Sequence, residues 1–213
     1  LNLEITMITK KELIDTTLLA IIDSHKTYLK WSGNEWLWNA PEYLLTVKIA
    51  EKLANINKNK FITLEDNVEK TLDRAGAKGQ GKISSKIRAN GRFDIVLWWA
   101  KGDPRTIIEV KHRVYKFANI EEDIIRIIET IKRKSSESSI KYGMVAFYMS
   151  NFYKNNAKKV FRKGRFDMVP VIDNIETGLH DWNTVLGKLA EELDIRLDAP
   201  TKQPDPARLP AIV

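Results

Sequence analysis

One aspartate and one Glu-x-Lys triplet carry the side chains best suited to chemistry in this chain. Asp94 lies within the run 91–99, and Glu109, Val110 and Lys111 lie in the next run of similar composition. Two carboxylates and a backbone carbonyl oxygen form a hard-oxygen site that suits Mg2+ with several waters retained. Such an ion neutralises phosphate charge and activates a bound water, which a neighbouring lysine can orient or deprotonate. This chemistry is that of phosphodiester hydrolysis.

Two strands are expected to bring these side chains together. Both runs are rich in β-branched and aromatic residues, and the segment 100–105 between them contains Gly-Asp-Pro, which favours a turn. We therefore predict an antiparallel hairpin. Because side chains alternate faces along a strand, Glu109 and Lys111 should point the same way, with Asp94 across the ladder from them.

Asp94 and the triplet Glu109-Val110-Lys111 resemble the motif of the PD-(D/E)XK nuclease superfamily, which has the restriction-endonuclease-like fold. Phe93 replaces the leading proline, a loose part of the motif. The resemblance implies a Mg2+-dependent endonuclease acting on DNA and leaving a 5′ phosphate, with Mn2+ as a further supporting ion. It also implies that Asp94, Glu109 and the Val110 carbonyl hold the metal while Lys111 acts on the water.

Many members of that superfamily add a glutamate from the helix before the first core strand. Pro41 followed by an acid marks the start of such a helix, and Glu42 is our choice for the additional catalytic carboxylate. Glu51 is the competitor and Glu35 a more distant one, because spacing within one helix does not show which turn faces the site.

Three other interpretations stay open. Glu-x-Lys on one strand face is also an ordinary ion pair. Within enzymes, the alternative is a structure-selective or repair nuclease. Outside enzymes, it is a catalytically silent nucleic-acid-binding module of the same fold, which the presence of all three motif residues argues against.

The charge of the chain favours a polyanionic partner. The formal net charge is +7, and two stretches, 74–92 and 151–166, contain several basic residues and no acidic residue. Such clusters can neutralise phosphates and make binding depend on salt. The predicted DNA contacts are Lys78, Lys82, Lys86, Arg88, Arg92, Lys158, Lys159 and Arg162.

A glycine-rich segment, 76–83, resembles a phosphate-binding P-loop without completing it. Ile83 stands where the motif needs serine or threonine for Mg2+, and neither a buried strand before it nor a long helix after it is expected. We interpret it as a flexible loop through which backbone and lysines approach DNA.

The element order predicts an α/β fold with a restriction-endonuclease-like core, a central mixed β-sheet flanked by helices. We expect one nuclease-like domain at 1–199, with a helical extension at 1–40 and a Pro-rich tail at 200–213. Helices are expected at about 9–30, from Pro41, at 66–75, 120–134, from about 155 and at 181–193. Strands are expected at 60–64, 91–99, 106–111, 142–149 and 168–172.

Composition limits location and partners. The chain has no cysteine, no apolar stretch approaches membrane-spanning length, and no signal peptide is apparent, so no membrane contact and a cytoplasmic location are expected. Enzymes with one site that cut both strands commonly act as two-fold dimers, which leaves a homodimer open although the sequence identifies no interface.

Overall fold

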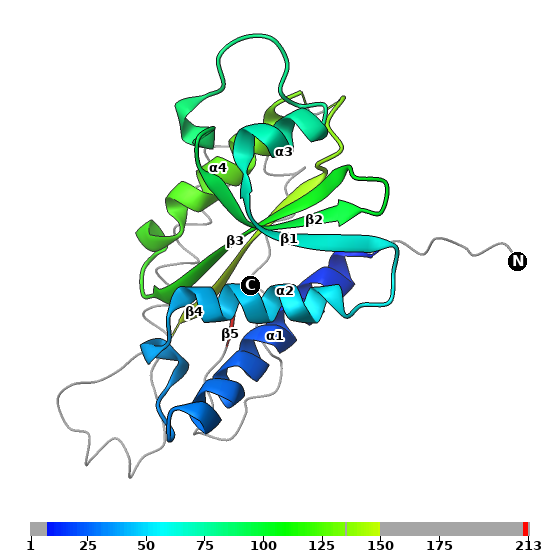
Figure 1. The fold of residues 1–213 in the computed structure, drawn as a ribbon. Coiled ribbons are helices and arrows are strands. Elements are labelled where there is room, and N and C mark those ends of the chain that lie inside the picture. Colours follow the sequence, from blue (N-terminus) through cyan, green and yellow to red (C-terminus); the bar gives the residue numbers. More distant parts are fainter. Residues whose placement is uncertain (1–7, 135, 150–210, 213) are drawn as a thin grey trace, which may run out of the picture.

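The computed structural model describes residues 8–134, 136–149 and 211–212. In this part of the chain a mixed sheet lies between helices, which confirms the α/β class (Figure 1). The helices are α1 (Lys10–Trp31), α2 (Glu42–Ala54), α3 (Val68–Arg74) and α4 (Glu121–Lys132). The strands are β1 (Lys60–Asn67), β2 (Arg92–Trp99), β3 (Pro104–Val114), β4 (Tyr142–Met149) and the short β5 (Ala211–Ile212). Single 3-10 turns lie at Leu37–Asn39, Ser85–Ile87 and Phe117–Asn119.

The strands follow chain order across the sheet, from β1 to β5. β1, β2 and β3 pair antiparallel, whereas β3 and β4 pair parallel because α4 lies between them in the chain. The predicted hairpin is confirmed, since Ile95 of β2 pairs with Ile108 of β3. Gly102, in its turn, has a φ of +97°, a conformation that favours glycine.

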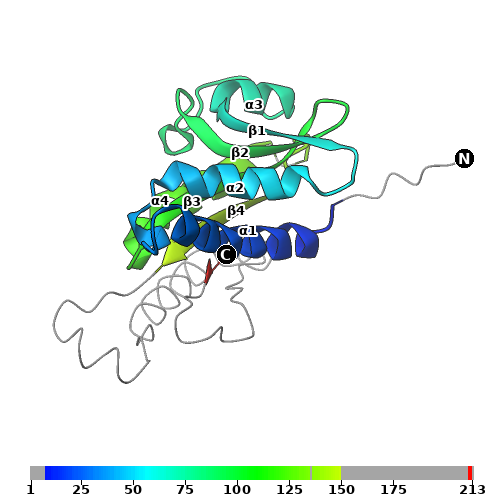
Figure 2. The same ribbon diagram turned by 60° about the horizontal axis from the view of Figure 1, so that its bottom comes forward.

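Two hydrophobic cores cover the two faces of the sheet, with α1 and α2 on one side and α3 and α4 on the other (Figures 1 and 2). Successive residues of β3 enter different cores, because strand side chains alternate. The core under α1 and α2 includes Leu45, Ile49, Ile95, Ile108 and Val110. The core under α3 and α4 includes Val68, Leu72, Val96, Ile107 and Ile127.

The helix starts follow the sequence signals. Thr9 caps α1, where its side chain accepts from the Glu12 backbone N–H and the Glu12 carboxylate accepts from the Thr9 N–H, as the capping-box pattern predicts. α2 begins at Glu42, directly after Pro41.

Several boundaries differ from the sequence prediction. β1 continues through Asp66 to Asn67, whose side chain accepts from the Lys70 N–H and caps α3, so the helix starts later than expected. β3 runs beyond the predicted 106–111 because it also pairs with β4, as far as Val114 opposite Met149. Within the predicted tail, Ala211–Ile212 is extended and pairs antiparallel with β4.

The elements predicted between residues 150 and 200 lie outside the described residues, and so does the expected domain limit at 199. In the part of the chain that is described, none of the helices combines the length and the apolar character that crossing a membrane requires.

Candidate active site

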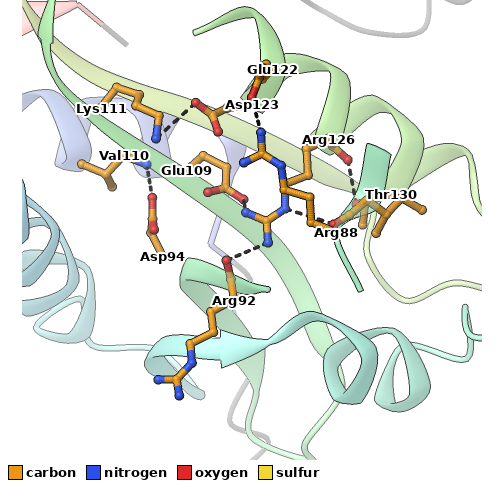
Figure 3. Close-up of polar contacts among 11 residues, drawn as sticks. Arg88, Arg92, Asp94, Glu109, Val110, Lys111, Glu122, Asp123, Arg126 and Thr130 are labelled. Atoms are coloured by element: carbon orange, nitrogen blue, oxygen red, sulfur yellow. Dashed lines mark hydrogen bonds and ion pairs between the residues drawn. The ribbon is translucent and has the colours of Figure 1, made fainter. Parts of the chain in front are cut away.

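Asp94 lies where the ladders on both sides of β2 are interrupted. On the β1 side, the pairs Leu64–Ile95 and Asp66–Phe93 leave Asp94 opposite Glu65, which has a φ of +54° and no ladder partner. On the β3 side, the pairing with β2 begins at Ile95, one residue after Asp94. The half-buried Asp94 carboxylate uses this opening, since Oδ2 accepts from the Val110 backbone N–H at 2.7 Å (Figure 3). The carboxylate thus replaces a backbone acceptor.

Glu109 is almost completely buried, at 1% exposure, and points toward α4 (Figure 3). Its Oε1 lies 2.8 Å from Nη1 of Arg126, which is 4% exposed. Burial raises the pKa of Glu109, Arg126 opposes the rise, and the charges of Asp94 and Asp123 add to it. The net result is a pKa of about 9, so ionisation of Glu109 depends on the positive charge near it.

Lys111 lies on the same face of β3 as Glu109 and also points toward α4 (Figure 3). Its Nζ is 3.4 Å from Oδ2 of Asp123, which is buried. Burial alone would lower the pKa of Lys111, but the charges of Asp123, Glu42 and Asp94 outweigh it and raise that pKa. The side chain is therefore an ammonium at neutral pH, which favours orienting water and stabilising negative charge over the predicted alternative of deprotonating water.

Of the three glutamates proposed for the preceding helix, Glu42 and Glu51 lie in α2, whereas Glu35 lies before it, so its placement on the helix was wrong. Glu42 is exposed, and its Oε2 accepts from the His112 backbone N–H of β3 at 2.8 Å. Glu51 pairs with Lys48 on its own helix, and Glu35 accepts from Asn39. Of the three, Glu42 is the one that contacts the strand carrying Glu109 and Lys111, and its charge acts on Lys111.

Asp123 and Arg126 complete this group and were not among the predicted site residues. The isoleucines Ile124, Ile127, Ile128 and Ile131 have the spacing of a core-facing side of this helix, yet Ile124 and Ile131 are only partly buried. The buried residues of α4 are Asp123, Arg126, Ile127, Ile128 and Thr130. The available signal was the i, i+3 spacing of an acid and an arginine beside Ile127, which places both on one helical face.

A metal ion fits the chemistry of the donors. Asp94 and Glu109 supply carboxylate oxygens, and Glu109 Oε1 is buried without an aligned hydrogen bond. Both groups already have protein contacts, through Val110 and Arg126. No cluster of three or more His, Cys, Asp or Glu side chains arranged for a metal is found within residues 8–134, 136–149 and 211–212. Binding through Asp94, Glu109 and the Val110 carbonyl therefore stays a prediction.

The first basic stretch forms the rim of a surface pocket of about 560 Å³. Lys78, Lys82 and Arg88 line it together with Gly79, Gly81, Ser84 and Ser85. Lys78 pairs with Glu69 at 3.0 Å, and Arg88 pairs with Glu122. Lys82, Lys86 and Arg92 are exposed, and no ion pair to an acidic side chain is found for them among the described residues. Lys158, Lys159 and Arg162 lie outside the described residues.

Comparisons with known proteins do not identify a relative: no protein-family model, curated protein or solved structure matches this chain. The functional argument therefore depends on the residues and their geometry.

Proposed function

We propose that this chain is a Mg2+-dependent endonuclease with a restriction-endonuclease-like core, acting on DNA through Asp94, Glu109 and Lys111. The observation that carries the proposal is the placement of these three residues. They lie on adjacent central strands, beside an interruption of the β1–β2 ladder, and their charges act on one another. Carboxylates crowded in this way are costly for folding and are typical of functional sites.

The arrangement of elements also supports the proposal. A helix, α2, precedes a three-stranded antiparallel unit, and α4 then leads to a parallel fourth strand. This is the core order that the resemblance implied. Asp94 and Glu109 come from the central strands β2 and β3, and Glu42 reaches β3 from the start of α2.

The protein residues have separable roles in the proposed reaction. A bound Mg2+, held by Asp94, Glu109 and the Val110 carbonyl, would neutralise phosphate charge and lower the pKa of a coordinated water. Lys111, held 3.4 Å from Asp123, would orient the attacking water and stabilise the charge that develops on the phosphate. Because its pKa is raised, Lys111 acts here as a donor rather than as a base.

DNA binding is assigned to the basic rim near β2. Lys82, Lys86 and Arg92 are exposed, and Gly91 of the pocket wall lies three residues before Asp94. Three residues span at most about 10 Å, so a phosphate bound at this wall would lie close to Asp94. The rim would therefore hold backbone phosphates next to the carboxylates.

One observation favours the catalytically silent alternative. Both proposed metal ligands are already engaged by protein groups, Asp94 by the Val110 N–H and Glu109 by Arg126. A module that only binds nucleic acid would keep these contacts permanently, whereas in a nuclease the ion must replace at least one of them.

A substrate panel separates these functions. Supercoiled, linear, single-stranded and branched DNA are incubated with the full chain in Mg2+ or EDTA, with Asp94→Asn as the control. Mg2+-dependent cleavage that Asp94→Asn lacks supports the nuclease, and a preference for branched DNA assigns the structure-selective class. Salt-dependent binding without cleavage of any substrate would instead establish the silent module.

Binding is tested in parallel with Lys82→Ala/Lys86→Ala. The slope of log affinity against log salt should flatten by up to about 2 units, because each lysine that contacts a phosphate contributes about one. Lys101→Ala/Lys141→Ala, at two exposed lysines elsewhere on the molecule, is the matched control. An unchanged slope in the first variant would assign Lys82 and Lys86 to solvent.

A further inference from the structure

Arg126 is a buried cation beside the Glu109 side chain. Its Nη1 lies 2.8 Å from Glu109 Oε1, and both residues are less than 5% exposed. The charges of Asp94 and Asp123 also act on Glu109. Arg126 therefore supplies positive charge to Glu109, which two other acids also approach.

The guanidinium is fixed by contacts that do not involve these acids. Nη2 donates to the Arg92 carbonyl at 2.7 Å, and Nε donates to the Ile87 carbonyl at 3.2 Å. The guanidinium carbon lies 4.8 Å from the centre of the Phe93 ring. These contacts use the planar, multiple-donor geometry of arginine, and they hold the charge beside Glu109 even when Glu109 has another partner.

The contact with Glu109 itself is less specific. Although the two atoms are within ion-pair distance, Glu109 Oε1 has no aligned hydrogen bond from the guanidinium. The attraction is thus mainly one of charge, and a second cation can satisfy it equally well.

We propose that Arg126 is a built-in counter-cation that pairs with Glu109 in the ion-free protein and competes with a divalent ion for that side chain. The inference rests on the metal site of the proposed function. Arg126 is a positioning residue here, because it acts on the ion through Glu109. The contact with Arg126 explains how the protein can fold with Glu109 buried before an ion is bound.

Competition between two cations is a coupling between sites, so it can be measured as a change in affinity. Mg2+ binding is followed by calorimetry in the full chain, without DNA, for wild type, Arg126→Gln and Arg126→Lys. Arg126→Gln keeps an amide donor but removes the charge, and should bind Mg2+ about 5- to 150-fold more tightly, the usual range for such coupling. Arg126→Lys keeps the charge and should stay near wild type.

Arg133→Gln is the matched control. Arg133 extends from the end of α4 and donates to the Ala77 and Lys78 carbonyls, so it holds loop backbone as Arg126 does, but it pairs with no carboxylate among the described residues. Its Mg2+ affinity should equal that of wild type. Equal or weaker Mg2+ binding by Arg126→Gln would overturn the inference.

A measurement on wild type covers the case in which Arg126→Gln does not fold. In the 15N spectrum of the arginine Nε groups, Mg2+ should move the Arg126 signal and leave the Arg133 signal in place. An unmoved Arg126 signal at saturating Mg2+ would overturn the inference, as would absence of Mg2+ binding. The substrate panel tests the nuclease function independently of these results. Competition without cleavage would reject the nuclease function and support the role of Arg126. Cleavage without competition would support the nuclease function and reject the role of Arg126.

Discussion

The two faces of β3 differ in what they bury. Toward α1 and α2, Ile108 and Val110 enter a continuous apolar core. Toward α4, Ile107 is followed by Glu109 and Lys111, which meet charged partners. An apolar face is stable wherever it packs, whereas a buried charged face needs each charge to be balanced. Folding alone explains the first face, and the second is the face to which we assign the proposed function.

The largest effect is expected where this balance is broken. Glu109→Leu or Arg126→Met alone leaves one buried group without its partner and should lower the free energy of unfolding by about 3–5 kcal/mol. The double variant removes both charges and should be more stable than either single variant. Urea unfolding at pH 7 measures the cycle, and additive losses would contradict a coupled pair.

The apolar face provides the comparison. Ile108→Ala should lower the free energy of unfolding by about 2–5 kcal/mol, because the Ile108 side chain is fully buried and its loss leaves a cavity in the core. Nuclease activity per folded molecule should remain at the wild-type level below the unfolding transition. Loss of cleavage in a fully folded Ile108→Ala protein would show that the two faces are not separate in function.

The smallest expected effect is the pH dependence of stability, which differs in sign between the partly exposed Glu12 and the buried Asp123. A hydrogen bond from Lys58 is the main cause that lowers the pKa of the partly exposed Glu12 to about 2, whereas burial raises the pKa of Asp123. The stability from Glu12 is present above its unfolded pKa, near 4.5, and is lost as pH falls toward 2. Asp123 has the opposite sign, since ionising it costs stability as pH rises through its folded pKa.

Comparing wild type with Lys58→Met by thermal unfolding between pH 2 and 7 tests the Glu12 contribution. The difference in melting temperature should be small, because solvent reaches the Glu12 carboxylate and screens the pair, and should shrink below pH 4.5. A difference that grows toward pH 2 would mean that Glu12 is not stabilised by Lys58.

The local elements could be predicted because their signals lie within a few residues. Thr9 with Glu12 marks α1, and Gly102 lies in the turn between two β-branched runs. Asp94, Glu109 and Lys111 could be chosen for the same reason, as polar residues within apolar strands. The structure confirms that they lie on two paired strands, as predicted, and their catalytic roles stay predictions.

The partners of those residues could not be predicted, because they depend on how α4 rotates over the sheet. Four of its five isoleucines have the spacing of one buried face, but Asp123 and Arg126 also turn inward, toward Lys111 and Glu109. The spacing of apolar residues along a helix predicts which of them pack in the core, but it does not show which charged residues are buried as pairs. The raised pKa of Lys111 follows from the same tertiary contacts.

The central claim is that the charged face of β3 performs chemistry, and Lys111→Ala tests it most directly. Nicking of supercoiled DNA in Mg2+ is measured beside thermal unfolding, with Lys141→Ala as the control at an exposed lysine. Lys111→Ala should lower cleavage by at least about 10² while DNA affinity stays near wild type, because the ammonium acts on the water and the developing charge. Full cleavage by a folded Lys111→Ala protein would contradict the account.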